Sequence, residues 1–406
     1  MDLEALRSAG TGTLVPISGV DARIGRDFRY YAFVPAPLPS EPTLGLGALN
    51  DATNAAMAVA RLDQAVAQLP NPALLLRPII RREAVSTSAL EGTYAAFDEV
   101  LEADFLTDMQ LSIEQREVMN YVHATSLALK MLEEYPISRR LLGAVQKEIV
   151  QRTRDDSYEA GDLRQHQVAI GPKDRPVDEA RLVPPPPGPE LENGFSEWER
   201  WVNAENRVPI IVKVALAHYQ FEALHPYNNG NGRLGRLIAV LQLVQEGILH
   251  QPVLNLAPWL ENRRDEYIDG LLSVSKTGDW NPWVSFISTA ILTQAEEGIR
   301  TISDLIEFKA EMIRRVRDAK LRGAAVELAE ILIGYPLIDV QTASSLIGKT
   351  FETANQAVSK LVSLGILHEV TGRRVNRLFV CKDILDITSG RRLLRARSNP
   401  NELTLF

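Results

Sequence analysis

The 406-residue sequence predicts an all-α-dominated protein with one small β-hairpin and a C-terminal winged-helix domain. Three observations lead to this fold class. Alanine, leucine and charged residues recur at helical spacing over 49–134, and the same pattern occurs again over 195–320. Two short strand candidates flank a turn within 167–183. Three helices followed by a β-ribbon over 322–386 form the pattern of a winged helix.

The first 45 residues predict an irregular arm, because proline, glycine and mixed polar residues leave only short β-like pieces such as 30–34. Helical spacing then begins near Leu49 and is broken by Pro-Asn-Pro at 70–72. A second helical run covers 138–154. The four successive prolines at 184–187 are typical of a stiff polyproline spacer.

The C-terminal unit carries basic residues in its predicted wing and in the tail that follows. These arginines are Arg373, Arg374, Arg377, Arg391, Arg392, Arg395 and Arg397. Basic clusters bind phosphate backbones, whereas the predicted recognition helix, 351–364, offers only Lys360 and a few polar residues. DNA binding and protein docking are therefore equal alternatives for this unit.

Composition restricts the classes of protein. The net charge of -8 provides no global basic field that would attract nucleic acid or membrane. The single cysteine, Cys381, forms no internal disulfide, which fits a reducing compartment. No run of about 20 apolar residues is present, and the early acidic residues of 1–5 are unlike a signal peptide. We therefore expect a cytoplasmic protein without a membrane partner.

The most informative segment is the loop His-Pro-Tyr-Asn-Asn-Gly-Asn-Gly-Arg-Leu-Gly-Arg at 225–236, between two predicted helices. Its histidine precedes a proline and is expected to be extended. Gly230 and Gly232 let main-chain N–H groups converge at the start of the second helix, where the helix dipole favours an anion. Arg233 and Arg236 are three residues apart and share one helix face. Two cations at the positive end of a helix predict an anionic ligand, and forked guanidinium groups suit a polyphosphate.

This loop resembles the signature of the Fic (filamentation induced by cAMP) family, His-Pro-Phe-x-Asp/Glu-Gly-Asn-Gly-Arg-x-x-Arg. The matching residues are His225, Pro226, Gly230, Asn231, Gly232, Arg233 and Arg236, with Tyr227 in the aromatic position. The resemblance covers roughly 45–300 and implies a Fic-type helical core. Enzymes of this family mostly transfer AMP from ATP to hydroxyl side chains of target proteins. By resemblance, His225 is the general base, Asn231, Gly230, Gly232 and Arg233 hold the phosphates, and Arg236 takes the terminal phosphate.

Asn229 departs from the family pattern, because the family usually has Asp or Glu there as the ligand of the metal ion. The resemblance implies ATP as co-substrate together with Mg²⁺ or Mn²⁺. A neutral amide oxygen is a poorer ligand for a hard cation than a carboxylate. We therefore expect either weaker metal binding at Asn229 or an ion held by the nucleotide and water alone.

The segment Thr-Ser-Ala-Leu-Glu-Gly at 87–92 ends a predicted helix at Gly92. An acid near a helix C-terminus opposes the dipole, so Glu91 indicates a cationic partner. The segment resembles the family's inhibitory motif, Ser/Thr-x-x-x-Glu-Gly/Asn. This resemblance implies that Glu91 pairs with Arg236 and occupies the place of the terminal phosphate.

Two further segments are similar to parts of the family. The hairpin at 167–183, which follows a Gly-Asp-Leu-Arg lead-in at 161–164, resembles the flap, and its edge would bind a target protein as an added strand. Tyr267 and the segment 278–280 resemble the region behind the nucleotide, where Tyr267 contacts the adenosine. Packing in the core is the alternative for Tyr267.

The sequence thus predicts six parts. They are an N-terminal arm (1–45), an N-terminal helical region with the inhibitory motif (46–135), a Fic catalytic core (136–300), a linker helix (301–321), a winged-helix domain (322–386) and a basic tail (387–406). The predicted function is a self-inhibited protein adenylyltransferase. The alternatives are a nucleotide-sensing transcriptional regulator with weak or no transferase activity, and a Fic-like enzyme that uses another phosphate-group donor or removes AMP. A homodimer is expected from the resemblance only.

Overall fold

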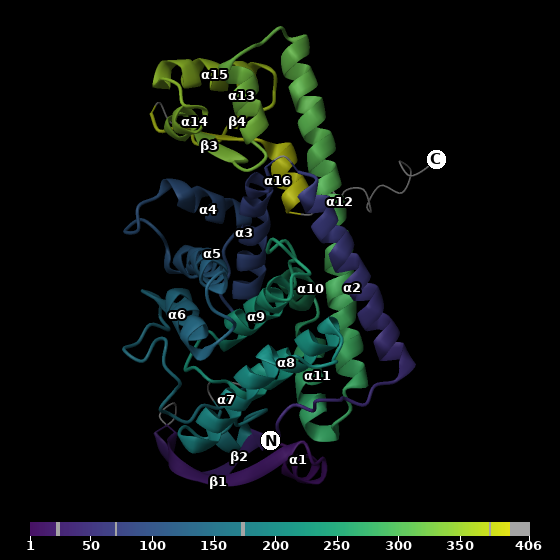
Figure 1. The fold of residues 1–406 in the computed structure, drawn as a ribbon. Helices are drawn as coiled ribbons and strands as arrows, with labels where there is room; N and C mark the ends of the chain where they lie inside the picture. Colours follow the sequence, from purple (N-terminus) through teal and green to yellow (C-terminus); the bar gives the residue numbers. More distant parts are fainter. Residues whose placement is uncertain (22–24, 70, 172–174, 373–374, 390–406) are drawn as a thin grey trace.

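The structure is a computed structural model that describes residues 1–21, 25–69, 71–171, 175–372 and 375–389. Helices dominate these residues, which confirms the all-α-dominated fold class. The C-terminal unit lies at one end of the molecule and an N-terminal hairpin lies at the other (Figure 1). Among the described helices, none combines the length and the apolar composition that a bilayer-spanning helix requires.

The N-terminal residues form regular structure, and the expectation of an irregular arm is wrong. Helix α1 (Leu3–Ser8) precedes strands β1 (Gly12–Asp21) and β2 (Arg26–Pro35), which pair antiparallel from Gly12↔Pro35 to Asp21↔Arg26. The ladder is stabilised by packing against residues that are distant in the sequence, so the local pattern of residues does not reveal it. Ala32 and Phe33 are buried, and the Phe33 N–H donates to the Val183 carbonyl at 2.8 Å.

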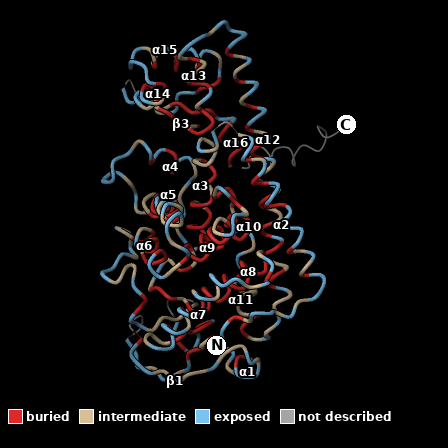
Figure 2. The backbone as a smooth tube through the Cα atoms, viewed as in Figure 1, coloured by how far each residue is buried: buried red, intermediate tan, exposed pale blue. Residues whose placement is uncertain are grey.

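The helical core is built around two buried helices, α8 (Ile210–Leu224) and α9 (Asn231–Gln245). Both are apolar on nearly every face, as expected for helices in the middle of a domain, and Figure 2 shows buried residues concentrated there. The indole N–H groups of Trp198 and Trp283 donate to the carbonyls of Ala217 and Ala215 on α8, at 2.9 and 2.8 Å. These contacts fix the helix that leads into the loop at 225–236.

The other core helices surround this pair. They are α2 (Leu46–Ala67), α3 (Pro72–Leu90), α4 (Phe97–Glu102), the 3₁₀ turn η1 (Ala103–Phe105), α5 (Ile113–Leu132), α6 (Arg139–Val150), the 3₁₀ turn η2 (Val177–Glu179), α7 (Pro189–Asn203), α10 (Ala257–Glu261) and α11 (Arg264–Thr277). The 38-residue α12 (Asn281–Asp318) runs beside α2 (Figure 1). The predicted linker helix is thus the far end of α12.

The C-terminal unit contains α13 (Ala324–Ile331), β3 (Leu337–Asp339), α14 (Val340–Ile347), α15 (Phe351–Ser363), β4 (His368–Glu369), β5 (Leu378–Val380) and α16 (Lys382–Thr388). Its three strands are antiparallel in the order β3-β5-β4. The sequence predicted α13, α14, α15 and the last two strands, but neither β3 nor α16. The winged-helix assignment stays a prediction, and Arg373, Arg374 and the tail arginines lie outside the described residues.

The segment predicted as a hairpin at 167–183 is less regular than expected. Its described residues form a single antiparallel bridge, Ile170↔Leu182, instead of two paired strands. The prolines that follow do not form a free spacer, because Pro184 and Pro185 are buried. The Gln167 amide donates to the Pro184 carbonyl at 3.0 Å, which ties this segment to the prolines.

Helix α3 is held by the C-terminal unit near its first turns. The Arg77 guanidinium lies over the Tyr335 ring, 4.3 Å from its centroid. Gly334 packs against the main chain of Leu74 so closely that a Cβ at 334 would lie 2.7 Å from the Leu74 oxygen. The opposite end of α3 carries Glu91, so one helix connects the C-terminal unit to the site.

Candidate active site

A cavity of about 1300 Å³ opens where α8 passes into α9. The loop 225–233 and α11 line it, together with the end of α3, the segment 165–171 and β1 of the N-terminal hairpin. Pockets for one small molecule commonly measure about 300–1,000 Å³. This cavity therefore has room for a nucleotide and for part of a second molecule.

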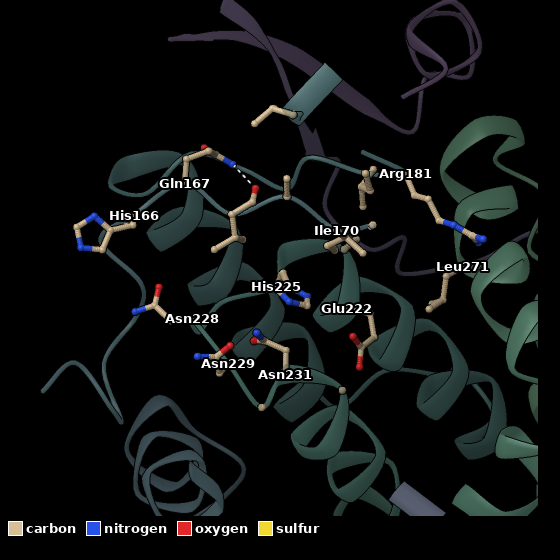
Figure 3. Close-up of a pocket in the computed structure, with 18 of the residues that line it drawn as sticks. His166, Gln167, Ile170, Arg181, Glu222, His225, Asn228, Asn229, Asn231 and Leu271 are labelled. Carbon is tan, nitrogen blue, oxygen red and sulfur yellow. Dashed lines mark hydrogen bonds between the residues drawn. The ribbon is translucent and has the colours of Figure 1, made fainter. Parts of the chain in front are cut away.

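His225 lies in the centre of the labelled residues of this cavity (Figure 3). It ends α8 in the left-handed conformation, with φ 47° and ψ 60°, and its N–H donates to the Phe221 carbonyl at 2.9 Å. The expectation of an extended residue is therefore wrong. A following proline disfavours right-handed helical geometry, and here the chain leaves the helix through a left-handed cap instead.

Burial and nearby charges set the protonation state of the His225 imidazole. Burial lowers its pKa to about 4; the Arg164 guanidinium acts in the same direction, and Glu91 opposes both. The ring is therefore neutral at pH 7, as a general base must be. No described side chain holds its Nδ1, and a hydrogen bond to the Glu222 main chain acts to raise the pKa of the ring.

The start of α9 lies where the sequence predicts an anion site. Gly230 precedes the helix with a φ of 78°, a conformation that favours glycine. The Asn231 side chain closes the loop, because its Oδ1 accepts from the Tyr227 N–H at 2.9 Å and its Nδ2 donates to the Tyr227 carbonyl at 2.7 Å. Both polar atoms of Asn231 are thus engaged, and the N–H groups of the first helical turn face the cavity without intrahelical partners.

Arg236 and Glu91 form the ion pair that the inhibitory motif implies. Arg236 Nη2 lies 2.7 Å from Glu91 Oε1, and Arg236 is 2% exposed. The same guanidinium donates to Thr87 Oγ1 at 2.6 Å and to the Thr87 carbonyl at 3.1 Å. A Cβ at Gly232 would collide with Glu91 Oε1, so the carboxylate lies directly over the first turn of α9.

Glu91 remains charged in this position. Burial raises its pKa, but the facing Arg236 guanidinium has the opposite effect, and the pKa is lowered overall. An ionised carboxylate therefore occupies the place where an anionic ligand would meet both Arg236 and the positive end of α9.

Arg233 is also paired in this state. Its Nη2 lies 2.9 Å from Asp155 Oδ2, and its Nη1 lies 3.9 Å from Glu117 Oε2. The side chain is buried, and Nη1 has no hydrogen-bond partner among the described residues. A bound phosphate would satisfy this donor.

Tyr267 forms part of the floor under Arg236. Its hydroxyl lies 2.8 Å from His218 Nε2, and His218 Nδ1 lies 3.1 Å from the Gly235 carbonyl. Burial lowers the pKa of His218 to about 4, so the ring is neutral, Nδ1 donates to the carbonyl and Nε2 accepts from the hydroxyl. Tyr267 is buried and also lines the cavity, so contact with adenosine stays a prediction.

Two cavity residues escaped the sequence reasoning. Glu222 lies one turn before His225, and burial raises its pKa to about 7, although Arg236 opposes this shift. Its Oε1 has no partner among the described residues. Arg164, known from the sequence only as the end of the lead-in, is fully buried behind His225. Its acceptors are main-chain carbonyls, which leave no signal in a sequence.

The side chains near Asn229 do not fit a metal site with a protein carboxylate. Asn229 is exposed and offers only an amide oxygen. The nearby Asp155 pairs with Arg233, and Glu159 lies 3.3 Å from His166 Nε2 and accepts from the Asn228 amide. No group of three or more His, Cys, Asp or Glu residues that suits a metal ion occurs in the part of the chain that the structure describes.

The geometry defines a class: a helical protein with a glycine-rich loop and two arginines beside a neutral, half-buried histidine. Comparison with family models gives the particular family. The model of the Fic/DOC family N-terminal region matches residues 49–130, and the Fic/DOC family model matches residues 136–243. These residues match the Fic/DOC family, which confirms the resemblance that the loop indicates.

Curated relatives match through part of their length. A protein adenylyltransferase Fic from Culex quinquefasciatus is 32% identical over 203 residues, 47% of this chain and 35% of that protein. One from Drosophila ananassae is 29% identical over 216 residues, 50% of this chain and 38% of that protein. This chain thus aligns with little more than a third of these relatives.

A crystal structure of a Fic family protein from Desulfovibrio desulfuricans G20 has a TM-score of 0.55 with this chain. The match covers 84% of this chain and 98% of that one, at 18% sequence identity. At this identity the comparison supports the fold alone.

Proposed function

We propose that this chain is a self-inhibited protein adenylyltransferase, which transfers AMP from ATP to a Ser, Thr or Tyr hydroxyl of a target protein. The observation that carries the proposal is the neutral His225 beside an anion site in which the Glu91 carboxylate lies against Arg236. Transfer requires a base next to a phosphate cradle, and self-inhibition requires a group that competes for the cradle.

In the proposed reaction, the phosphates of ATP lie at the start of α9, where the N–H groups of Gly232 and its neighbours and the guanidinium groups of Arg233 and Arg236 neutralise their charge. The adenosine extends along the α11 wall, where Tyr267, Ile268 and Leu271 line the cavity. His225 accepts the proton of the target hydroxyl as its oxygen bonds to the α-phosphorus of ATP. The bond from the α-phosphorus to its bridging oxygen breaks, and pyrophosphate leaves with the electron pair.

The target segment is proposed to bind along 167–183. Gln167 and Ile170 lie on the opposite side of His225 from Asn229 and Asn231 in Figure 3. A segment docked there would present its hydroxyl to the imidazole while ATP lies below. An extended target chain would gain main-chain hydrogen bonds by this mode of binding.

Other partners enter the proposal with different support. Mg²⁺ or Mn²⁺ is expected to arrive on the phosphates of ATP, because Asn229 supplies only a neutral ligand. DNA binding has little support, since the one wing arginine that is described, Arg377, lies over the Phe379 ring at 5.2 Å. The homodimer and the cytoplasmic location stay predictions from the sequence.

The test uses ATP labelled on its α-phosphate, with Mg²⁺ or Mn²⁺, and three proteins: the unsubstituted chain, Glu91→Gly, and Glu91→Gly with His225→Ala. We expect covalent label on the chain or on lysate proteins with Glu91→Gly, weaker label with the unsubstituted chain, and none with the double variant. ATP binding without any label would contradict AMP transfer and would favour the nucleotide-sensing alternative. Label from a γ-labelled donor only would indicate another transferred group.

A further inference from the structure

We propose that Arg164 is the positioning residue of the catalytic histidine: it aims His225 by holding the main chain on both sides of that residue, and it places a positive charge beside the imidazole. The inference rests on the proposed function, because it assumes that His225 acts as the base. It concerns a side chain that does not line the cavity and would touch neither ATP nor target.

The geometry is a buried guanidinium that donates only to main-chain carbonyls. Arg164 is 0% exposed, and its Nε donates to the His225 carbonyl at 2.8 Å. Nη2 donates to the carbonyls of Pro185 at 2.5 Å and Leu224 at 3.4 Å, and Nη1 donates to that of His166 at 3.1 Å. Its own N–H donates to the Pro226 carbonyl at 3.0 Å. One residue thus joins the last turn of α8 to two segments next to the cavity.

These contacts matter because the His225 ring has no side-chain partner to orient it. In many catalytic histidines a carboxylate holds the nitrogen that does not react. Here no described side chain holds Nδ1, and the hydrogen bond that acts on the ring comes from the Glu222 main chain, so the direction of the ring depends on the main chain. That main chain is left-handed, a conformation that costs free energy for any residue with a Cβ. Anchoring the carbonyls of Leu224 and His225 to one rigid group keeps this conformation populated.

Arginine suits this task better than lysine. Its planar guanidinium carries five N–H donors in a fixed arrangement, whereas an ammonium group carries three that rotate. Four carbonyls from three segments of the chain accept from Arg164 here. A lysine would preserve the charge while leaving buried carbonyls without donors, which separates the positioning effect from the electrostatic one.

The charge acts on the same histidine. Arg164 approaches His225 from behind α8, while Glu91 faces it from the end of α3, and Glu222 lies one turn earlier on α8. Arg233 and Arg236 lie across the cavity on α9. Burial is the main reason for the low pKa of His225, and Arg164 lowers it further. No acidic side chain pairs with Arg164 among the described residues, so its positive charge is not cancelled nearby.

The experiment uses Glu91→Gly as the parent and adds Arg164→Lys, Arg164→Gln or the control Arg154→Lys. Arg154 is an exposed arginine of the preceding loop that pairs with Glu114 and does not line the cavity. Each protein is tested for folding by its melting temperature, for ATP binding by calorimetry, for the rate of AMP transfer at saturating ATP, and for the pKa of His225. The last comes from ¹³C-labelled histidine in an NMR titration, in which His225→Asn identifies one signal among the six histidines.

We expect Arg164→Lys to bind ATP within about threefold of the parent but to transfer AMP about 100-fold more slowly, the size expected when a reacting group is misplaced by about 1 Å. Arg164→Gln should also raise the pKa of His225, whereas Arg154→Lys should match the parent in every measurement. Parental transfer rates in Arg164→Lys, or an unchanged His225 pKa in a folded Arg164→Gln, would overturn the inference.

Two outcomes keep this inference separate from the proposed function. If the parent transfers no AMP, the proposed function fails, while the NMR titration still measures whether Arg164 acts on His225. If Arg164→Gln does not fold, the unsubstituted protein decides the electrostatic part. A His225 signal that titrates near pH 6.5 there would contradict it, because burial and the Arg164 charge together lower this pKa to about 4.

Discussion

Removing the Glu91 carboxylate is expected to raise the affinity for ATP about 30-fold. Any phosphate that reaches Arg236 must first displace Glu91 Oε1, which lies 2.7 Å from Nη2. A hydrogen bond to a charged group is worth about 1.5–3 kcal/mol. The Glu91 side chain is 39% exposed, which favours a value of about 2 kcal/mol within that range, and this corresponds to about 30-fold in affinity. Arg236 stays in place without Glu91, since Thr87 accepts two of its hydrogen bonds.

The assay is isothermal titration calorimetry with ATP, ADP and AMP on the unsubstituted chain and on Glu91→Gly, Glu91→Gln and Glu91→Asp. The gain should be greatest for ATP, smaller for ADP and absent for AMP, because only the outer phosphates compete with Glu91. Glu91→Asp should resemble the unsubstituted chain more than Glu91→Gln does. Glu102→Gln, an exposed carboxylate outside the cavity, serves as the control for a general loss of negative charge.

The reasoning is refuted if Glu91→Gly binds ATP no more tightly than the unsubstituted chain. It is also refuted if the gain is equal for ATP and AMP, because Glu91 would then compete with the nucleoside or act only through the general electrostatic field. An equal gain in Glu102→Gln would lead to the same conclusion.

Three other substitutions or conditions test separate parts of the site. Asn229→Asp should make ATP binding depend more strongly on Mg²⁺, because a carboxylate is the better ligand. Titrations of ATP in the presence of Mg²⁺ and of EDTA measure this. An unchanged ratio of the two ATP affinities would mean that residue 229 does not face the ion. Burial lowers the pKa values of His218 and His225 to about 4, so stability should fall as the pH drops from 6.5 towards 4, because the unfolded chain binds protons that these folded histidines do not. Each of the two histidines contributes up to about 1.4 kcal/mol per pH unit to the pH dependence of the free energy of unfolding. In urea unfolding, His225→Asn should therefore show a shallower pH dependence than the unsubstituted chain. An equal pH dependence would argue against a neutral, half-buried His225. Gly143→Ala should cost about 1–3 kcal/mol, because its Cβ would collide with the Gly161 carbonyl, whereas Gly47→Ala on α2 has open space; a neutral result at both positions in urea unfolding would contradict the packing.

Much of the fold could be predicted because helix signals are local. Ser138 and Thr350 precede helices and accept hydrogen bonds from the first turn, as their residue types indicate. Gly92 follows the end of α3 with a φ of 92°, a conformation suited to glycine. The loop at 225–236 was identified because its glycines, histidine and arginines are all close in sequence.

The parts that could not be predicted depend on distant main-chain groups. The β1–β2 ladder contains Pro16 and two glycines, so its local pattern is weak, and its packing against 177–183 lies far away in sequence. The backbone of His225 was assigned to the wrong region because the rule for residues before proline excludes one conformation without choosing between the others. The four acceptors of Arg164 are carbonyls, which every residue type carries.

The contacts of α3 explain how the proposed inhibition would be reversible. Two of the Arg236 hydrogen bonds go to Thr87, and only the third goes to Glu91, so ATP can replace the Glu91 carboxylate while α3 stays folded and Arg236 stays aimed. Displacement of the Glu91 carboxylate still requires the end of α3 to move, because the carboxylate lies in contact with Gly232. The first turns of α3 are fixed by Tyr335 and Gly334 of the C-terminal unit, so the movement must take place in the last turn. Gly92, directly after Glu91, is the residue best able to absorb that change in the backbone.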